Sequence, residues 1–163
     1  MRFIFLPEGL TILLFFIIWP AIQVGSAIFC LKMPDRFFKS NKGIYSSKKF
    51  EQNGKFYEKV FKVKKWKHLL PDGGALYKKK GYAKKKLTDF SDENLNKFLV
   101  ESCRAELTHW LPIFFSWIFF FITTPFIVLL MFVYSLIVNM PCILVQRYNR
   151  PRIEKLIKQK YGR

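Results

Sequence analysis

Apolar residues gather into two long stretches of the chain, and charged residues occupy the parts between and after them. Residues 10–31 and 110–145 contain no Asp, Glu, Lys or Arg. A helix needs about 20 consecutive apolar residues to cross the hydrocarbon core of a bilayer, so residues 10–31 predict a transmembrane helix. A cleaved signal peptide is the alternative, but this stretch is longer than the apolar region of a signal peptide, and Arg2 is balanced by Glu8.

Residues 110–145 are too many for one upright span. As a straight helix they would measure roughly 54 Å, whereas the hydrocarbon core is about 30 Å thick. We therefore expect a membrane hairpin that turns near residues 123–125, with a second break at residues 139–141; each of these sites ends in a proline. A single long helix, tilted and kinked, is the alternative.

The polar segment at residues 32–109 carries weaker patterns. Apolar and aromatic residues alternate with lysines over residues 44–50 and 56–63, which predicts two strands joined by a turn at residues 51–54. From Ser91, a candidate N-cap, apolar residues recur at helical spacing up to the hairpin. We expect this amphipathic helix to lie on the membrane surface and to lead into the hairpin.

Together these patterns predict a small polytopic α-helical membrane protein with an α+β basic segment. Its parts are a transmembrane helix at residues 10–31, the basic segment at 32–109, a membrane helical hairpin at 110–145 and a basic tail at 146–163. The chain then has three spans, or one span plus a membrane hairpin that enters and leaves on the same side.

The distribution of charge predicts the orientation in the membrane. The 163 residues include 28 Lys and Arg against 11 Asp and Glu, a net charge of +17, and most basic residues lie in segment 32–109 and the tail. Because basic flanks stay in the cytoplasm, we expect a multi-pass protein of the cell membrane whose basic segments both face the cytoplasm. The three cysteines are too far apart in sequence for a disulfide framework or a zinc site.

Two runs of three lysines, at residues 78–80 and 84–86, attract phosphate groups of any kind. Because apolar spans adjoin them, anionic membrane lipids are nearer partners than nucleic acid, for which the sequence has no recognised binding module. An acidic acyl carrier protein, or another phosphate-bearing acyl donor, is a further candidate partner. A solvated loop without a specific ligand is the plain alternative.

The chain contains two histidines, and each has a carboxylate close to it in sequence. Asp72 follows His68 at the fourth position, and Glu106 precedes His109 by one helical turn. Histidine can remove a proton from a hydroxyl near neutral pH, and a carboxylate can orient its ring. We expect the two histidines to lie close together and favour His109 as the base. The two pairs offer too few ligands for a metal unless all four converge, so no metal is predicted.

Polar and aromatic residues beside these pairs are candidates for binding the substrate, the carbonyl oxyanion or the phosphates of a donor. They are Trp66, Lys67, Arg104, Trp110, Arg147, Tyr148, Asn149 and Arg150. Structural roles are the alternative: a turn at His68, boundary side chains at His109 and Trp110, and a membrane-surface helix in the basic tail.

Four motifs follow one another between residues 33 and 152: MPDRFF, KKFEQNGKFYEKVFKVKKWKHLLPDG, ESCRAELTHW and NMPCILVQRYNRPR. In this ordered set, which includes both histidine motifs, the chain resembles the glycosyl-diaponeurosporenoate acyltransferase family of carotenoid-producing bacteria. The resemblance implies a small integral membrane enzyme. Such an enzyme esterifies the sugar of a glycosylated carotenoid acid with a fatty acyl chain, the closing step of a staphyloxanthin-type pigment.

The residues and the resemblance together predict a membrane-embedded O-acyltransferase. Its co-substrate is an acyl thioester donor, either acyl-CoA or an acyl carrier protein, and its acceptor is a glycosylated carotenoid or similar lipid glycoside, with no further cofactor. A non-catalytic membrane scaffold or an anionic-lipid-binding protein is the alternative. The two histidine–carboxylate pairs near the membrane boundary favour the enzyme, because a scaffold does not need them.

Overall fold

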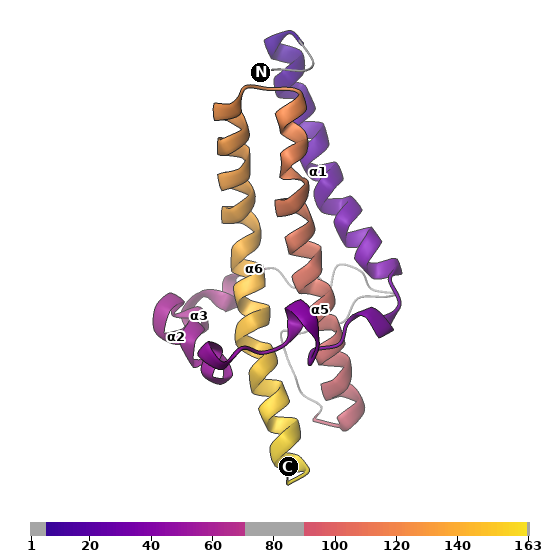
Figure 1. Ribbon diagram of the computed structural model, residues 1–163, viewed down its shortest axis with the longest axis vertical. Helices are drawn as coiled ribbons and strands as arrows, with labels where there is room; N and C mark the ends of the chain where they lie inside the picture. The colour runs from indigo at the N-terminus through magenta and orange to yellow at the C-terminus, as the bar shows by residue number, and fades with distance from the viewer. Residues whose placement is uncertain (1–5, 71–89, 163) are drawn as a thin grey trace.

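Three long helices make up most of the protein in the computed structural model, which describes residues 6–70 and 90–162 (Figure 1). They are α1 (Glu8–Lys32), α5 (Asp92–Phe115) and α6 (Pro125–Lys160). α1 and α6 run in the same direction, while α5 runs against them and packs along both. The architecture is predominantly helical, as the sequence predicts.

Two of these helices, α1 and α6, are long and apolar enough to cross a membrane. Both expose large apolar side chains, for example Phe16 and Ile137, and broad exposed apolar surfaces mark contact with lipid or with a partner. α5 does not meet the same requirement, because its first half carries charged residues. The described residues therefore contain two candidate spans, and the predicted third crossing is not confirmed.

The predicted hairpin turn is confirmed. α5 continues through the 3-10 helix η5 (Ser116–Phe121) to a turn at residues 122–124, and Pro125 then begins α6. Proline is favoured at the first helical position, where its missing N–H has no helical partner. The second predicted break, at residues 139–141, is wrong. α6 continues through Pro141, because packing against α5 supports the helix where one backbone hydrogen bond is lost.

The amphipathic helix is confirmed, but its position differs from the expected one. Ser91 caps α5, its Oγ accepting the backbone N–H of Asn94 at 3.4 Å. α5 then continues without interruption into the apolar arm and runs alongside α6, so it does not branch off as a separate surface helix (Figure 1). Leu95 and Phe98 pack against Ile153 of α6, because α6 extends through most of the predicted tail and covers this apolar stripe.

The two predicted strands are wrong, because no strand occurs in the described residues. The chain there forms short helices: η1 (Asp35–Phe37), η2 (Gly43–Tyr45), η3 (Lys49–Gly54), α2 (Lys55–Phe61), α3 (Val63–Trp66) and η4 (Lys67–Leu69). A strand needs a neighbour to receive its backbone hydrogen bonds, whereas a helix satisfies them internally. With Tyr57 and Val63 buried against α6, this segment satisfies its backbone as helices.

The predicted turn at residues 51–54 is present, although it joins helical segments. Gln52, Asn53 and Gly54 all have positive φ, at 47°, 57° and 84°. Gly54 also lies close to α6, because a Cβ at this position would be 2.5 Å from the carbonyl oxygen of Tyr148. Only glycine combines this φ with so close an approach of two backbones.

Residues 33–70 wrap around the charged half of the α5–α6 pair (Figure 1). Phe38 and Tyr45 pack on Cys103 of α5, and α2 and α3 pack on α6 around Tyr148. The wrapping brings polar side chains to the level at which the apolar part of α6 ends. Asp72 and both lysine runs lie outside the described residues.

Candidate active site

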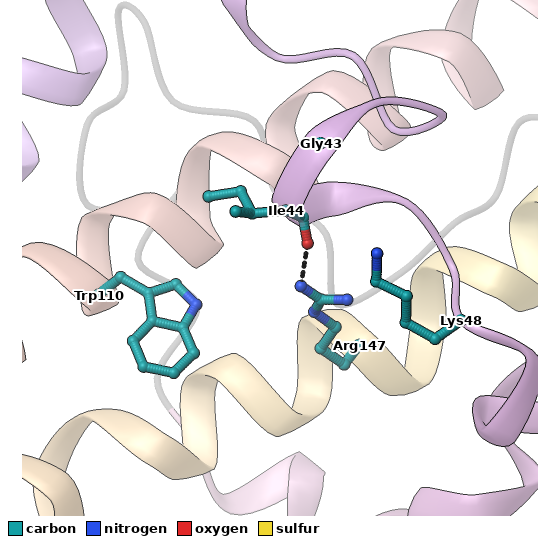
Figure 2. Close-up of a pocket in the computed structure, with 5 residues that line it drawn as sticks. All are labelled: Gly43, Ile44, Lys48, Trp110 and Arg147. Atoms are coloured by element: carbon teal, nitrogen blue, oxygen red, sulfur yellow. Dashed lines mark hydrogen bonds between the residues drawn. The ribbon is translucent and has the colours of Figure 1, made fainter.

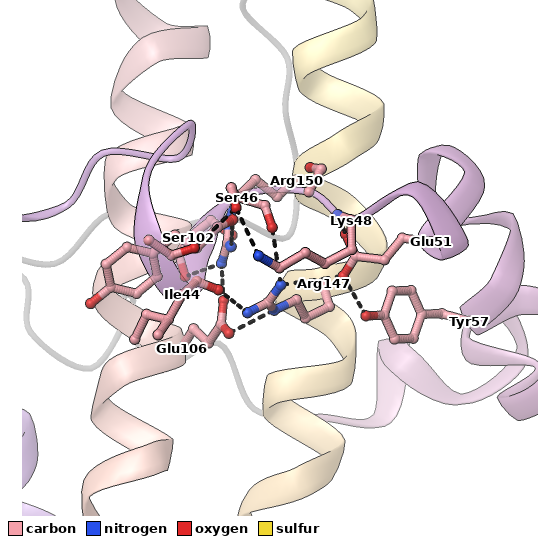
Figure 3. Close-up of polar contacts among 12 residues, drawn as sticks. Ile44, Ser46, Lys48, Glu51, Tyr57, Ser102, Glu106, Arg147 and Arg150 are labelled. Carbon is pink, nitrogen blue, oxygen red and sulfur yellow. Dashed lines mark hydrogen bonds and ion pairs between the residues drawn. The ribbon is translucent and has the colours of Figure 1, made fainter.

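A buried carboxylate joins α5 to α6 at this level. Glu106 has no exposed surface, and its two oxygens accept hydrogen bonds from two arginines of α6 (Figure 3). Arg147 donates through Nε at 2.7 Å, and Arg150 donates to the second oxygen. The indole N–H of Trp110 also points to Glu106, at 3.3 Å. Charge-assisted hydrogen bonds of this kind are about twice as strong as neutral ones.

A second buried carboxylate completes the network. Glu51 accepts hydrogen bonds from Arg147 at 3.3 Å, from the Tyr57 hydroxyl at 2.6 Å and from the backbone N–H of Lys48 at 2.7 Å. Burial, together with the hydrogen bond to Glu51, raises the pKa of Tyr57 well above its ordinary value, so its hydroxyl remains a donor. Two carboxylates now balance two guanidinium groups, and the network is neutral although it is buried.

The arginines that were expected to bind substrate already form hydrogen bonds and ion pairs within the protein. Arg147 also donates to the carbonyl oxygen of Ile44, and Arg150 to that of Tyr45 at 2.8 Å. Arg104 donates to two carbonyls at the end of α1 and pairs with Asp35 and Glu101. Because carbonyls and carboxylates engage these guanidinium groups, we assign them to holding residues 30–57 in place.

His109 lies against α6 within the apolar part of the helix pair. Its Nδ1 is 3.0 Å from Oδ1 of Asn139, which is fully buried. The amide nitrogen of Asn139 donates to the carbonyl of Ser135 at 2.9 Å, and this contact fixes the amide with its oxygen toward the ring. Since that oxygen can only accept, the Nδ1 of a neutral His109 carries the proton and Nε2 carries the lone pair.

Asn139 therefore takes the position beside His109 that the sequence had suggested for Glu106. A helical neighbour at i−3 was a reasonable candidate, but two arginines of α6 bind Glu106 more strongly. The sequence did contain a signal for Asn139, because a polar side chain within an uncharged apolar stretch marks a functional position. Within residues 6–70 and 90–162, no group of His, Cys, Asp and Glu side chains is arranged to hold a metal ion.

A pocket of about 570 Å³ opens beside the network (Figure 2). Its lining residues are Gly43, Ile44, Lys48, Trp110 and Arg147. The indole ring and the Ile44 side chain give it an apolar wall, Lys48 brings positive charge, and Arg147 borders it while paired within the network (Figure 2). Such a combination suits an amphiphilic ligand whose polar group lies at the membrane boundary. Trp110 directly follows His109 in the chain.

The remaining predicted residues gather on another face of α6. Lys67 donates to Asn149 at 3.2 Å and lies over the ring of Tyr148, and Trp66 packs against the cluster of buried residues that includes Tyr148. His68 is the next residue of η4, and it is exposed. The structure thus brings these four binding candidates together, away from His109.

The two histidines do not converge as expected. Tyr148 follows Asn139 by nine residues, which is about two and a half helical turns, so the two side chains point to opposite sides of α6. His109 contacts the Asn139 side, and the residue before His68 contacts the Tyr148 side. A shared site would need one of them to cross α6.

Known proteins that resemble this chain show the family to which it belongs. The family model of glycosyl-4,4'-diaponeurosporenoate acyltransferases matches residues 41–159. Proteins named glycosyl-4,4'-diaponeurosporenoate acyltransferase from Staphylococcus aureus strains bovine RF122 / ET3-1, N315 and USA300 are each 36% identical over 140 residues, covering 86% of this chain and 84% of theirs. No solved structure matches the chain. The matched region includes both histidines and the buried network. This chain is therefore an acyltransferase and belongs to the glycosyl-4,4'-diaponeurosporenoate acyltransferase family.

Proposed function

We propose that the protein transfers a fatty acyl chain from an acyl thioester to a sugar hydroxyl of a glycosylated carotenoid or similar lipid glycoside. Family membership supports this substrate class, because the relatives are named for a glycosylated carotenoid acid. The apolar surfaces of α1 and α6 suit the tail of such an acceptor. The enzyme would act within the cell membrane, with its basic segments in the cytoplasm.

His109 is the general base of this proposal, and its contact with Asn139 is the observation that carries it. Nε2 takes the proton of the sugar hydroxyl as the hydroxyl oxygen attacks the thioester carbonyl. The new carbon–oxygen bond forms the ester, the carbon–sulfur bond breaks, and the proton passes from Nε2 to the departing thiolate. Asn139 supports both steps by accepting a hydrogen bond from Nδ1–H, which stabilises the imidazolium that exists between the two proton transfers.

The pocket beside Trp110 is the proposed site of the sugar. An indole face packs well against the apolar face of a sugar ring, and the ammonium group of Lys48 can donate to a hydroxyl. The acceptor tail would then extend along the apolar part of α5 and α6. Trp110 follows His109 in α5, so a sugar bound there would lie at the same level of the helix as the base.

The test is acyl transfer by the purified protein in lipid nanodiscs, with acyl-CoA or acyl carrier protein as donor and the product identified by mass spectrometry. Replacing a general base typically lowers the rate by ~10²–10⁴, so His109→Gln should lose activity to that extent. His68→Gln is the matched control and should keep a much larger remainder. Full activity of His109→Gln would show that His109 is not the general base. A wild-type protein that forms no acylated glycoside would overturn the proposed function.

A further inference from the structure

Two positive groups from different elements meet on one aromatic ring. The Lys67 ammonium lies 5.0 Å from the centre of the Tyr148 ring, and the Arg152 guanidinium carbon lies 4.3 Å from it. Arg152 also donates to the hydroxyl of Tyr148, and Lys67 donates to Asn149 at 3.2 Å. Tyr148 is nearly fully buried, so the ring is a fixed support that holds both cations.

Neither cation forms an ion pair with a carboxylate in the described part of the chain. Every buried arginine there, by contrast, has at least one carboxylate partner. Glu58 lies near enough to favour the charged form of Lys67, but its carboxylate accepts the backbone N–H of Lys64 at 2.9 Å. The pair is therefore a positive site of two cations with a single carboxylate, that of Glu58, close enough to offset part of their charge.

Holding two like charges together opposes folding unless something offsets the repulsion. Burial lowers the pKa of Lys67, and the nearby Arg152 and Lys64 lower it further. An anion bound between Lys67 and Arg152 would reverse this cost. Arginine offers a planar fork and lysine a point charge, and both bind phosphate oxygens. The Arg152 side chain is exposed, so a ligand can approach from solvent.

We propose that Lys67 and Arg152 bind a phosphate group of the acyl donor. This inference rests on the proposed function and adds the donor site to it. Tyr148 lies roughly 14 Å beyond Asn139 along α6, on the charged side of the apolar stretch. Thioester donors that carry a phosphopantetheine arm have their phosphate at the end of the arm remote from the thioester. The phosphate would thus remain in water, and the flexible arm would pass around α6 to bring the thioester to His109 on the opposite side of that helix.

Direct binding tests the site without requiring catalysis. The probes are phosphopantetheine and pantetheine, which differ only in the phosphate, and the protein is the full chain in phosphatidylcholine nanodiscs. Wild type should bind phosphopantetheine at least ~10-fold more tightly than pantetheine, because only the phosphorylated probe offers charge-assisted hydrogen bonds to Lys67 and Arg152. Lys67→Gln and Arg152→Gln should each remove most of this difference.

Matched variants distinguish a specific phosphate site from nonspecific electrostatic attraction and from misfolding. Lys59→Gln in α2 and Lys155→Gln in α6 each remove one exposed charge from the elements nearby and should leave both affinities unchanged. Lys67→Arg keeps the charge and should retain most of the preference for the phosphorylated probe. Equal losses in the site variants and in these controls would overturn the proposal.

A phospholipid headgroup is the other source of the same phosphate chemistry. In nanodiscs of mixed phosphatidylcholine and phosphatidylglycerol, wild type and Arg152→Gln should retain the same lipids. If Arg152→Gln instead loses phosphatidylglycerol and binds phosphopantetheine as wild type does, the site belongs to the membrane and the donor proposal fails. Phosphate-dependent binding by a wild-type protein that transfers no acyl chain would leave the site standing and overturn the proposed function alone.

Discussion

Glu106 is fully buried, and its carboxylate is bound by Arg147 and Arg150. Such a pair contributes little net stability, because removing the charges from water costs about as much as their attraction returns. Removing one partner is different, since the other charges then remain buried without compensation. Replacing Glu106 alone should therefore destabilise the fold more than replacing all the charged partners with apolar residues would.

Glu106→Gln should lower the free energy of unfolding by about 3–5 kcal/mol, because it leaves two buried guanidinium groups with one carboxylate, that of Glu51. Thermal unfolding of the detergent-solubilised protein measures the loss. Asp92→Asn is the control: its pair with Lys160 is half exposed, and such pairs contribute about 1 kcal/mol or less. Similar losses in the two variants would contradict the assigned role of the buried network.

Gly54→Ala should destabilise the protein more than Gly43→Ala does. Both glycines have positive φ, so each substitution incurs a strain of about 1–2 kcal/mol. Only at Gly54 does the new Cβ meet backbone, at 2.5 Å from the carbonyl oxygen of Tyr148, whereas the space around Gly43 is open. Unfolding temperatures of the two variants give the comparison. Equal shifts would mean that the wrapped segment moves away from α6 without cost.

Sequence alone predicted part of the site at this scale. The spacing of Glu106, His109 and Trp110 shows that they share a helical turn. It cannot show which of them faces α6, because the partners Asn139 and Arg147 are 30 and 41 residues away from His109 and Glu106. Long-range hydrogen bonds depend on how α5 and α6 align, and no local pattern records that alignment.

At the scale of elements, one side chain fastens α1 to α5. The last carbonyls of a helix have no partner within it. Arg104 of α5 donates to the carbonyl of Cys30 at 2.6 Å and to that of Met33 at 2.8 Å, and so satisfies two of them at the end of α1. The planar fork of arginine reaches both carbonyls at once, which a lysine cannot do.

Arg104→Lys should loosen the end of α1. Each hydrogen bond from a charged donor contributes about 1.5–3 kcal/mol, so losing one should speed tryptic cleavage after Lys32 or Arg36 roughly tenfold. Mass spectrometry of the solubilised protein during digestion measures the rate. Asp35→Asn, which weakens only an exposed partner of Arg104, should change it much less. If Asp35→Asn speeds cleavage more than Arg104→Lys does, then the ion pair with Asp35, and not the hydrogen bonds to the carbonyls, holds the end of α1 in place.

Helices were predicted well where their signals are local, and strands were not. Ser91 caps its helix as predicted, and the turn predicted near residues 123–125 ends where Pro125 begins α6, because capping and the proline ring act within one turn. The alternation of residues 56–63 is equally compatible with short helices that bury Tyr57 and Val63. Whether such a segment forms strands depends on a neighbour that could pair with it, and α6 fills that place instead.

At the scale of the whole molecule, the order of the helices limits the possible topologies. α1 and α6 run in the same direction and both suit a membrane span (Figure 1). A chain that crosses twice in one direction must return between the crossings, and among the elements that the structure describes α5 with η5 leads to the start of α6. The turn at residues 122–124 lies at one end of α5 and α6, and the buried network joins the two helices within their charged half.

The depth of that turn distinguishes three spans from a re-entrant hairpin. The apolar part of α6, residues 125–145, is roughly 31 Å long as a helix, enough for a hydrocarbon core of about 30 Å. Its start should therefore reach the outer surface, while the basic end remains in the cytoplasm. We accordingly expect Thr124 and the beginning of α1 to lie on the same side of the membrane.

Labelling single cysteines in intact cells with a membrane-impermeant thiol reagent tests this arrangement. Gly9→Cys and Thr124→Cys should react without permeabilisation, and Lys158→Cys only after it, with the unsubstituted chain as background. Gly9 has no neighbouring atom within 4 Å, so the substitution fits. Protection of Thr124→Cys, alongside labelling of Gly9→Cys, would show that the hairpin ends inside the bilayer. The acceptor tail would then meet the tip of the hairpin within the membrane instead of passing along a complete span.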